Sequence, residues 1–307
     1  MKAVVFAYHN IGILGLEALV QEKFDIRGIF SHLDDPDENL WFGSVAEWGK
    51  ENQILVFCPQ NVNTPEWIEK IRNISPEVIF SFYYRNLLSK EILKIPSVGS
   101  FNLHGSLLPA YRGRCPINWV LVKGEQHTGV TLHHMVEGPD AGDIVGQKEV
   151  VIEFEDTSFT LYQKLCVQAK ELLGELLPLI KKGIVPRIAQ NLKEGSYYGG
   201  RRPEDGKIDW GWPVMQIYNL VRAVTEPYPG AFTYLPEGEK LFIWWALPKK
   251  SSVSKCPVGG LEFEKDNVYV RVSDGRLRLL DIEVGKERMK GQKILEFFKK
   301  QERGILR

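Results

Sequence analysis

An amide, an imidazole and a carboxylate occur in two short segments near the middle of the chain. Asn102 and His104 lie in Phe101-Asn-Leu-His-Gly-Ser-Leu-Leu-Pro109, and Asp140 lies in Glu137-Gly-Pro-Asp-Ala-Gly-Asp143. An amide can donate to a developing oxyanion, and an imidazole can carry a proton between reacting atoms. Together the three side chains suit acyl transfer to an amine.

The local pattern places the amide and the imidazole at the end of a strand. Residues Val98 to Leu103 are typical of a buried strand, in which side chains two residues apart project from the same face. Gly105 and Pro109 indicate that a loop follows, and such loops usually present the chemistry of a sheet. A histidine at a strand end is, however, more often structural, and Gly-Pro-Asp-Ala-Gly is also an ordinary turn composition.

Short apolar runs alternate with amphipathic runs in the first half of the chain, which predicts a mostly parallel, doubly wound α/β sheet. These runs are Ala3 to Ala7, Leu14 to Gln21, Ile26 to Ser31, Val45 to Glu51, Ile54 to Phe57, Trp67 to Ile74 and Val78 to Phe82. Gly12-x-x-Gly15 lacks the full dinucleotide fingerprint, so we interpret it as a tight strand-to-helix turn and predict no NAD.

The second half changes character after about residue 203, so we expect two domains, 1–203 and 204–307. Before that point the pattern predicts a helix over Pro116 to Gly124, two strands, a long helix over Thr157 to Lys182 and a linker over Lys193 to Pro203. Beyond it, short strands broken by Gly, Pro and Asp suggest a small barrel or sandwich. These are Phe232 to Tyr234, Leu241 to Trp245, Gly260 to Phe263, Asn267 to Val272 and Leu277 to Ile282.

Composition argues against several functional classes. The chain has 39 Lys and Arg against 39 Asp and Glu in 307 residues, so no overall positive field attracts nucleic acid. The basic segment from Lys286 to Arg307 is explained by a terminal helix with a solvated face. Four scattered cysteines form no metal or disulfide pattern, and no signal peptide or membrane span is evident. We therefore expect a soluble cytoplasmic protein without a metal.

The segments Asn102 to Gly113, Gly129 to Thr131 and Gly138 to Gly142 resemble the 10-formyltetrahydrofolate-dependent formyltransferase family. The resemblance implies that Asn102, His104 and Asp140 form the catalytic centre, with Asp140 raising the pKa of His104. It also implies a Rossmann-like catalytic domain followed by a smaller, OB-like β-barrel domain. In such enzymes the formyl group passes from N10 of the folate to an amine through a tetrahedral intermediate.

The resemblance further implies where the co-substrate 10-formyltetrahydrofolate binds. The residues concerned are Asn86, Leu87, Leu88, Arg114, Val136, Glu137, Gly138, Pro139 and Asp140. Without the resemblance, the leucines would be assigned to ordinary packing and Arg114 to a solvated surface.

Three acceptor amines are known among related enzymes: glycinamide ribonucleotide, methionyl-tRNA and nucleotide-linked amino sugars. The additional C-terminal domain counts against the first, and the neutral charge balance against the second. Three segments resemble the sequences of formyltransferases that act on UDP-4-amino-4-deoxy-L-arabinose, in the lipid A modification that gives polymyxin resistance. These segments are Phe80 to Arg85, Tyr111 to Val122 and Arg201 to Trp210. We expect this amino sugar as the acceptor.

Other interpretations stay open at this point. Arg201, Arg202 and Trp210 could bind the diphosphate and base of the nucleotide, or could fasten the linker to the first domain. Phe242, Trp244 and Trp245 could bury a homodimer interface or form a domain core. Hydrolysis of 10-formyltetrahydrofolate and a non-catalytic folate-binding or tRNA-binding module are the alternative functions.

Overall fold

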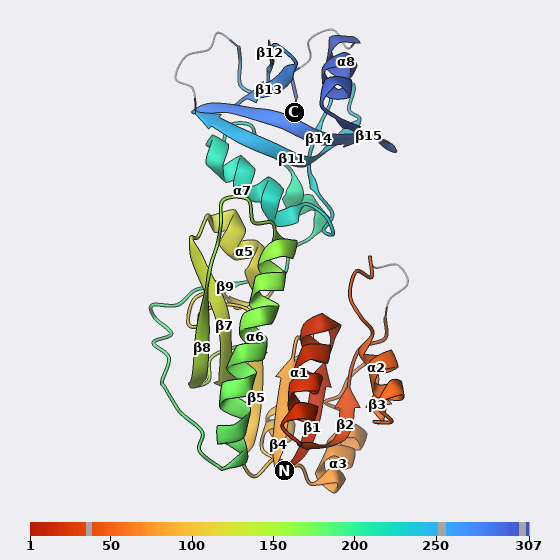
Figure 1. Ribbon diagram of the computed structural model, residues 1–307, viewed down its shortest axis with the longest axis vertical. Coiled ribbons are helices and arrows are strands. Elements are labelled where there is room, and N and C mark those ends of the chain that lie inside the picture. Colours follow the sequence, from red (N-terminus) through yellow and green to blue (C-terminus); the bar gives the residue numbers. More distant parts are fainter. Residues whose placement is uncertain (35–38, 251–255, 301–304, 307) are drawn as a thin grey trace. The chain divides into compact units, whose positions relative to one another are not determined.

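The computed structural model describes residues 1–34, 39–250, 256–300 and 305–306 (Figure 1). The chain divides into two compact units. The N-terminal unit comprises Met1–Pro116, His127–Val151 and Tyr162–Gly199, and the C-terminal unit comprises Ile117–Gln126, Ile152–Leu161 and Gly200–Arg307. The C-terminal unit therefore includes two short segments that interrupt the N-terminal unit along the chain.

Seven strands of the N-terminal unit form one sheet in the order β3-β2-β1-β4-β5-β7-β8. Their bounds are Lys2–Ala7 (β1), Asp25–Phe30 (β2), Val56–Phe57 (β3), Val78–Phe82 (β4), Gly99–His104 (β5), His127–His134 (β7) and Ile144–Val151 (β8). Strands β1 to β5 pair in parallel, whereas β7 and β8 run antiparallel to their neighbours. The order reverses between β1 and β4, where such sheets bind ligands. The expected mostly parallel sheet is confirmed.

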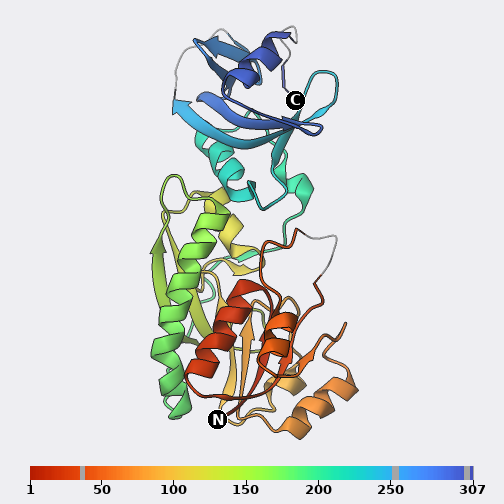
Figure 2. The same ribbon diagram turned by 45° about the vertical axis from the view of Figure 1, so that its right-hand side comes forward.

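Helices cover both faces of this sheet (Figures 1 and 2). Their bounds are His9–Gln21 (α1), Val45–Glu51 (α2), Pro65–Ile74 (α3), Lys90–Leu93 (α4) and Ser158–Lys181 (α6). On one face, Ile71 of α3 and Ile92 of α4 join Val4, Phe6 and Ile79 in a fully buried cluster. Because side chains alternate along a strand, the neighbouring residues of β1 and β4 face α1. The side-chain alternation of the strands and the one-sided apolar faces of the helices together account for the layered core.

Local sequence signals mark the ends of several elements. Every residue of β4 is buried, as its continuous apolar run requires of a central parallel strand. Helix α2 begins after Ser44, whose hydroxyl accepts the Glu47 N–H at 3.3 Å. Helix α3 begins with Pro65 at its first turn and ends at Ser75, which adopts φ 51°. Both helices lie where the sequence predicts them.

The two glycines of Gly12-x-x-Gly15 lie inside α1, so the predicted strand-to-helix turn is wrong. The helix begins at His9, immediately after β1. A Cβ atom on Gly15 would lie 2.3 Å from the ring of Phe82, so the glycine lets the helix approach the sheet closely. The spacing therefore serves helix-to-sheet packing.

A two-stranded parallel sheet joins β6 (Arg112–Gly113) to β9 (Tyr197–Tyr198). The sequence analysis predicted a linker over Lys193 to Pro203, but part of this segment pairs with the loop that follows β5. Pairing between residues so distant in sequence depends on the tertiary fold and leaves no periodic signal in two-residue strands.

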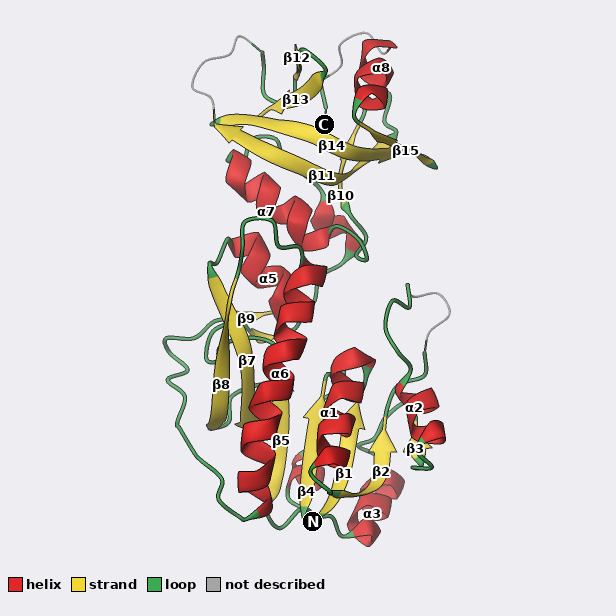
Figure 3. Cartoon of the chain, in the orientation of Figure 1, coloured by secondary structure: helices red, strands yellow, loops and turns green. Residues whose placement is uncertain are grey.

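The C-terminal unit contains an antiparallel sheet in the order β10-β11-β14-β13-β12, with β15 paired to β14 (Figure 3). The bounds are Ala231–Tyr234 (β10), Lys240–Lys250 (β11), Leu261–Glu264 (β12), Asn267–Arg271 (β13), Gly275–Val284 (β14) and Glu287–Lys290 (β15). This confirms the expected C-terminal domain built of short β-strands.

Helices α5 (Pro116–Lys123), α7 (Val214–Val224) and α8 (Gln292–Lys300) complete the fold, and a 3₁₀ turn spans Pro203–Gly206. Helix α7 was not predicted, because β-branched residues such as Val221 and Val224 are more typical of strands. Helix α8 confirms a terminal helix, although it begins later than expected because β15 precedes it. Residues 301–304 and 307 of the predicted helical segment lie outside the described residues.

A buried arginine joins α7 to the segment before α6 within the C-terminal unit. The Arg222 guanidinium is 5% exposed and donates to the carbonyl oxygens of Glu153, at 3.1 Å, and Asp156, at 3.3 Å. Asn118 of α5 donates to the Ala223 carbonyl oxygen at 2.7 Å. These bonds explain why segments 117–126 and 152–161 belong to this unit.

The described part of the chain contains no helix long and apolar enough to cross a membrane. Within the same residues, no group of three or more His, Cys, Asp or Glu side chains could hold a metal ion. The cysteines at positions 58, 115, 166 and 256 form no disulfide bond with one another.

Two helical glycines allow a matched test of close packing. We expect Gly15→Ala to destabilise the fold by about 1–3 kcal/mol, because its methyl group would overlap the buried Phe82 ring. Gly174→Ala in α6 should stabilise by about 0.5–1 kcal/mol, because nothing lies within 4 Å of its added Cβ. Urea denaturation followed by circular dichroism measures both changes. Equal effects of the two substitutions would contradict the packing role of Gly15.

Candidate active site

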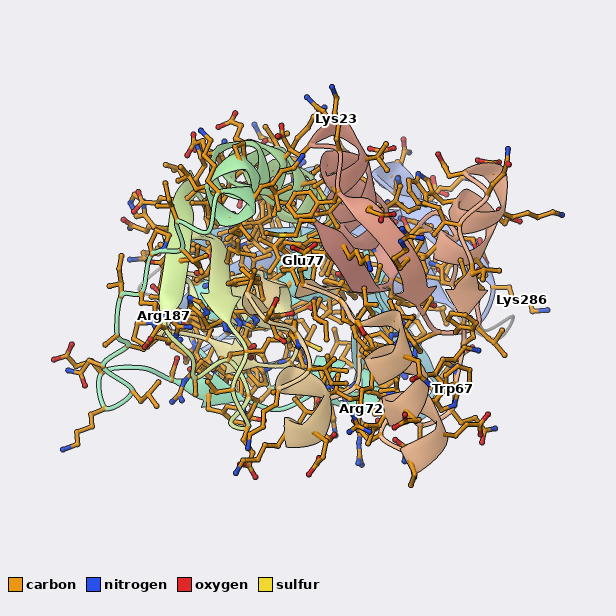
Figure 4. The ribbon with its side chains drawn as sticks, turned by 90° about the horizontal axis from the view of Figure 1, so that it is seen from below. Lys23, Trp67, Arg72, Glu77, Arg187 and Lys286 are labelled. Atoms are coloured by element: carbon orange, nitrogen blue, oxygen red, sulfur yellow. The ribbon has the colours of Figure 1, made fainter. Side chains whose placement is uncertain are left out.

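Two neighbouring strands place four polar side chains on one face of the sheet. In the antiparallel pairing of β5 with β7, Asn102 lies opposite His133 and His104 lies opposite Thr131. Residues two apart on each strand share a face, so all four side chains point the same way. They lie at the carboxyl end of β5, the end opposite to the one seen in Figure 4, where Glu77 precedes β4. The predicted position of Asn102 and His104 is therefore observed.

A turn after β7 presents Asp140 to these strands. Asp140 adopts φ 51°, a left-handed conformation that aspartate tolerates better than most residues. Gly142 follows where a Cβ atom would lie 1.9 Å from the His134 carbonyl oxygen, so only glycine fits. The turn thus needs this composition for its shape, and it also carries the predicted catalytic carboxylate.

Three side-chain nitrogens surround one oxygen of Asp140. The Asp140 Oδ1 atom lies 3.5 Å from Asn102 Nδ2, 3.6 Å from His104 Nδ1 and 3.4 Å from His133 Nε2. The other oxygen, Oδ2, accepts the backbone N–H of Gly113 at 2.8 Å. The structure therefore brings together the three residues that the sequence suggested as catalytic.

The backbone after β5 sets the orientation of the His104 ring. His104 Nε2 lies 2.8 Å from the carbonyl oxygen of Tyr111, which can only accept a hydrogen bond. Nε2 must therefore carry a hydrogen, and in the neutral ring Nδ1 holds the lone pair. Nδ1 is the nitrogen that faces Asp140. His104 thus presents a proton-accepting atom to the cluster.

His133 joins the site although the sequence analysis did not single it out. Its Nδ1 donates to the His134 carbonyl oxygen at 2.9 Å, so Nε2 of the neutral ring can accept from Asn102 Nδ2 at 3.1 Å. Period-two alternation along β7, together with its pairing to β5, is the signal that could have placed His133 beside Asn102. The contact orients the Asn102 amide.

Burial is the largest influence on both ionisable groups of the cluster. Burial alone would raise the pKa of Asp140, but the adjacent His104 and His133 lower it to about 2. Burial lowers the pKa of His104 from its ordinary 6.5, and Asp140 opposes this to a smaller extent. Asp140 thus raises the pKa of His104 as expected, but desolvation of the imidazolium outweighs this charge pairing, so the net shift of the pKa is downward. At neutral pH, Asp140 is ionised and His104 is uncharged.

The loop between β5 and β6 is held by buried hydroxyl groups. Thr131 Oγ1 donates to the Ser106 carbonyl oxygen at 2.6 Å and accepts the Leu108 N–H at 3.1 Å. Ser106 Oγ donates to the Ala110 carbonyl oxygen at 2.7 Å. The loop whose Tyr111 carbonyl orients His104 is therefore itself fixed.

The segments expected to bind folate lie beside one another. Lys90, just after Asn86 to Leu88, places its Nζ 3.5 Å from Glu137 Oε2 in the segment Val136 to Asp140. The side chains of Leu87 and Val136 are 65% and 47% exposed. Arg114 is also exposed and directly follows Gly113, the residue that binds Asp140. The ion pair therefore links the segment after Leu88 to the Asp140 turn, and Arg114 lies next in the chain to a residue that contacts Asp140.

The residues suggested for nucleotide binding belong to the C-terminal unit. The Arg201 guanidinium lies 4.6 Å from the centre of the Trp119 ring and donates to the Asp205 carbonyl oxygen at 2.9 Å. Arg202 is exposed. The Trp210 ring is 4% exposed, and its N–H donates to Thr233 Oγ1 at 3.0 Å. The surroundings of Trp210 favour packing, whereas both arginines lie at the surface.

Several solved structures share this fold. An N-formyltransferase from Helicobacter canadensis, in complex with folinic acid and dTDP-3-aminofucose, matches with a TM-score of 0.68 and 22% identity over 91% of this chain and 98% of that chain. WlaRD, a sugar 3N-formyltransferase in the presence of dTDP and 5-N-formyl-THF, matches with a TM-score of 0.66 and 19% identity over 93% and 97%. HypX from Aquifex aeolicus, in complex with tetrahydrofolic acid, matches with a TM-score of 0.61 and 18% identity over 98% and 48%.

Family models account for most of the sequence. The formyl transferase model matches residues 16–177, which is more than half of the chain and includes Asn102, His104 and Asp140. The model of the formyl transferase C-terminal domain matches residues 201–299. On this match, the chain belongs to the formyl transferase family and is a formyltransferase.

Proposed function

We propose that this formyltransferase transfers the formyl group of 10-formyltetrahydrofolate to the amine of a nucleotide-linked amino sugar. The observation that carries the proposal is the cluster of Asn102, His104 and Asp140 at the carboxyl end of β5, with three nitrogens within 3.6 Å of one carboxylate oxygen. Similar structures that contain folinic acid with dTDP-3-aminofucose, or dTDP with 5-N-formyl-THF, support both substrates.

The reaction forms one carbon–nitrogen bond and breaks another. The acceptor amine attacks the formyl carbon, and the carbonyl oxygen becomes negative in a tetrahedral intermediate. Asn102 Nδ2 can stabilise that oxygen, since its 3.5 Å contact with Asp140 is too long to engage its hydrogen strongly. Collapse of the intermediate breaks the bond to N10, which must gain a proton as it leaves.

His104 can carry that proton from one nitrogen to the other. In the neutral ring, Nδ1 accepts the proton that the attacking amine loses, and the resulting imidazolium returns it to N10. Asp140, 3.6 Å away, stabilises the transient positive charge. His104 therefore begins the cycle as a base and ends it as an acid.

The folate would lie along the two loops that carry Leu87 and Val136. Their exposed apolar side chains offer surface for the faces of a pterin, and backbone groups of Val136 to Asp140 offer hydrogen bonds to its edge. Arg114 is close enough in sequence to Gly113 to line the same site. A folate bound along these loops would bring N10 to the cluster of Asn102, His104 and Asp140.

We propose UDP-4-amino-4-deoxy-L-arabinose as the first acceptor to test, with Arg201 and Arg202 as candidates for binding its diphosphate. Guanidinium groups suit phosphate, and neither arginine is buried in the C-terminal unit. The packed Trp210 offers little ring surface to a base. Methionyl-tRNA is less favoured because equal numbers of acidic and basic residues give no general attraction for polyanions.

The electrostatic basis of the mechanism is testable without substrate. We expect the His104 imidazole to titrate below 6.5, and Asp140→Asn to lower its pKa further, because the carboxylate that favours the imidazolium is gone. Two-dimensional NMR of the histidine ring protons measures both. Asp143→Asn is the matched control, since it removes a nearby carboxylate that instead pairs with Arg187 at 3.5 Å. A higher pKa in Asp140→Asn would contradict the assigned interaction.

Substitutions should separate the three catalytic roles from folding. We expect His104→Ala to lower kcat by about 100- to 10,000-fold, and Asn102→Ala by about 100- to 1,000-fold. Asp140→Asn should also reduce kcat strongly while thermal denaturation remains close to wild type. Steady-state kinetics with a formylated product assay measures these losses. Near-normal turnover in Asp140→Asn, with Asp143→Asn as control, would remove Asp140 from the mechanism.

The acceptor is identified by mass spectrometry. The chain and 10-formyltetrahydrofolate are incubated with UDP- and dTDP-linked 3-amino and 4-amino sugars, with methionyl-tRNA, and without acceptor. We expect a mass gain of one formyl group on an amino sugar, with UDP-4-amino-4-deoxy-L-arabinose as the preferred acceptor. Formylated tRNA alone would overturn the proposed acceptor class, and formate released equally without acceptor would indicate hydrolysis.

A further inference from the structure

One side chain from a distant segment holds the turn that carries Asp140. Gln190 Nε2 donates to the carbonyl oxygen of Asp140 at 3.0 Å and to that of Gly142 at 2.5 Å. Both acceptors are carbonyl groups, so only the NH₂ end of the amide can satisfy them, and both of its hydrogens are used. The two bonds bracket the turn on either side of Ala141.

The turn has little internal support of its own. Asp140 adopts a left-handed conformation, which is unfavourable for a residue other than glycine. The backbone hydrogen bond within the turn, from Ala141 N–H to the Gly138 carbonyl oxygen, is long at 3.4 Å. An external donor that engages two carbonyl groups at once can therefore contribute much of what keeps the carboxylate in place.

The segment that carries Gln190 is anchored to the sheet just before this residue. Ile188 exchanges two backbone hydrogen bonds with Ile144 at the start of β8, at 2.8 and 2.9 Å. Arg187, labelled in Figure 4, also lies 3.5 Å from Asp143, but both side chains are exposed and such a surface ion pair contributes little. The two backbone hydrogen bonds of Ile188 therefore fix the position from which the Gln190 side chain reaches the turn.

The same segment also anchors the backbone that orients His104. Ser196 Oγ accepts the Tyr111 N–H at 2.8 Å, and the Ser196 carbonyl oxygen accepts the Arg112 N–H at 3.0 Å. The Tyr198 carbonyl oxygen accepts the Arg114 N–H at 2.9 Å. One continuous stretch of chain thus supports the partners of both catalytic groups.

We propose that Gln190 is a positioning residue of the formyltransferase, which acts through Asp140 by fixing the turn on which the carboxylate stands. Its two hydrogen bonds keep Asp140 within reach of His104 Nδ1 and Asn102 Nδ2. The inference rests on the proposed catalytic role of Asp140, and it assigns Gln190 no contact with either substrate.

Two variants of similar length remove the donors without shortening the side chain. Gln190→Met replaces the amide by an apolar group, and Gln190→Glu replaces it by a carboxylate that faces two carbonyl oxygens. Since displacement of a catalytic group by about 1 Å can cost about 100-fold, we expect kcat to fall by about 10- to 100-fold, with the larger loss in Gln190→Glu. KM for both substrates should stay near the wild-type value, because neither substrate contacts this side chain.

The matched control is Asn191→Ala on the same segment. Asn191 is exposed, and its side chain accepts the Lys193 N–H at 3.3 Å, a contact within its own loop. We expect this variant to retain wild-type turnover and melting temperature. Loss of the folded state in both Gln190 variants would overturn the inference, because it would make Gln190 a residue of general stability.

A double-mutant cycle distinguishes positioning of Asp140 from a separate structural effect. If Gln190 acts through Asp140, then Gln190→Met in an Asp140→Asn background should cause little further loss of kcat. Multiplicative losses would overturn the inference. A second readout is the NMR titration of His104, whose ring faces Asp140 and His133: its pKa should fall in Gln190→Met, as in Asp140→Asn, because the carboxylate no longer stabilises the imidazolium.

The result is separable from the proposed function. If the wild-type chain formylates no amino sugar, the proposed acceptor fails. If the wild-type chain formylates one and Gln190→Met does so at the same rate, the inference about Gln190 fails while the proposed function stands.

Discussion

A single carboxylate oxygen organises the site, because the side chains of Asn102, His104 and His133 all converge on Asp140 Oδ1. Asn102 and His104 lie at the end of the parallel strand β5, and His133 lies on its antiparallel neighbour β7. The carboxylate stands on a turn that reaches them from outside the sheet. A small displacement of this turn would therefore disturb the contacts of the amide and of both imidazoles together. This explains why several backbone groups around the turn hydrogen-bond to it or to its neighbours.

Burial and charge pairing act in opposite directions in this cluster. Water is largely excluded from His104, so the imidazolium loses more solvation than Asp140 restores, and the neutral ring is favoured at rest. The same burial would raise the pKa of Asp140, but His104, His133 and the Gly113 N–H together lower it to about 2. A neutral imidazole beside an ionised carboxylate is suited to receive a proton from an attacking amine and to return it to the leaving nitrogen.

The supports of the candidate catalytic groups come largely from backbone atoms and from distant segments. The Tyr111 carbonyl holds His104, and the Gly113 N–H holds Asp140. Both lie in a stretch that pairs with Ser196 to Tyr198, and Gln190 reaches the Asp140 turn from just upstream. The residues between α6 and the C-terminal unit thus do more than connect the two units.

The sequence by itself determined the mostly parallel sheet, a C-terminal domain of short strands and, through the family resemblance, the three catalytic candidates. Continuous apolar runs such as Val78 to Phe82 report local conformation and burial together, and the Asn-x-His pair follows the period of a strand. Only the tertiary structure decided the roles of Gly15, His133 and Gln190, and the protonation state of His104. Each of these depends either on contacts between segments far apart in the chain or on the exclusion of water from the site. The local periodicity of the sequence reports neither of them.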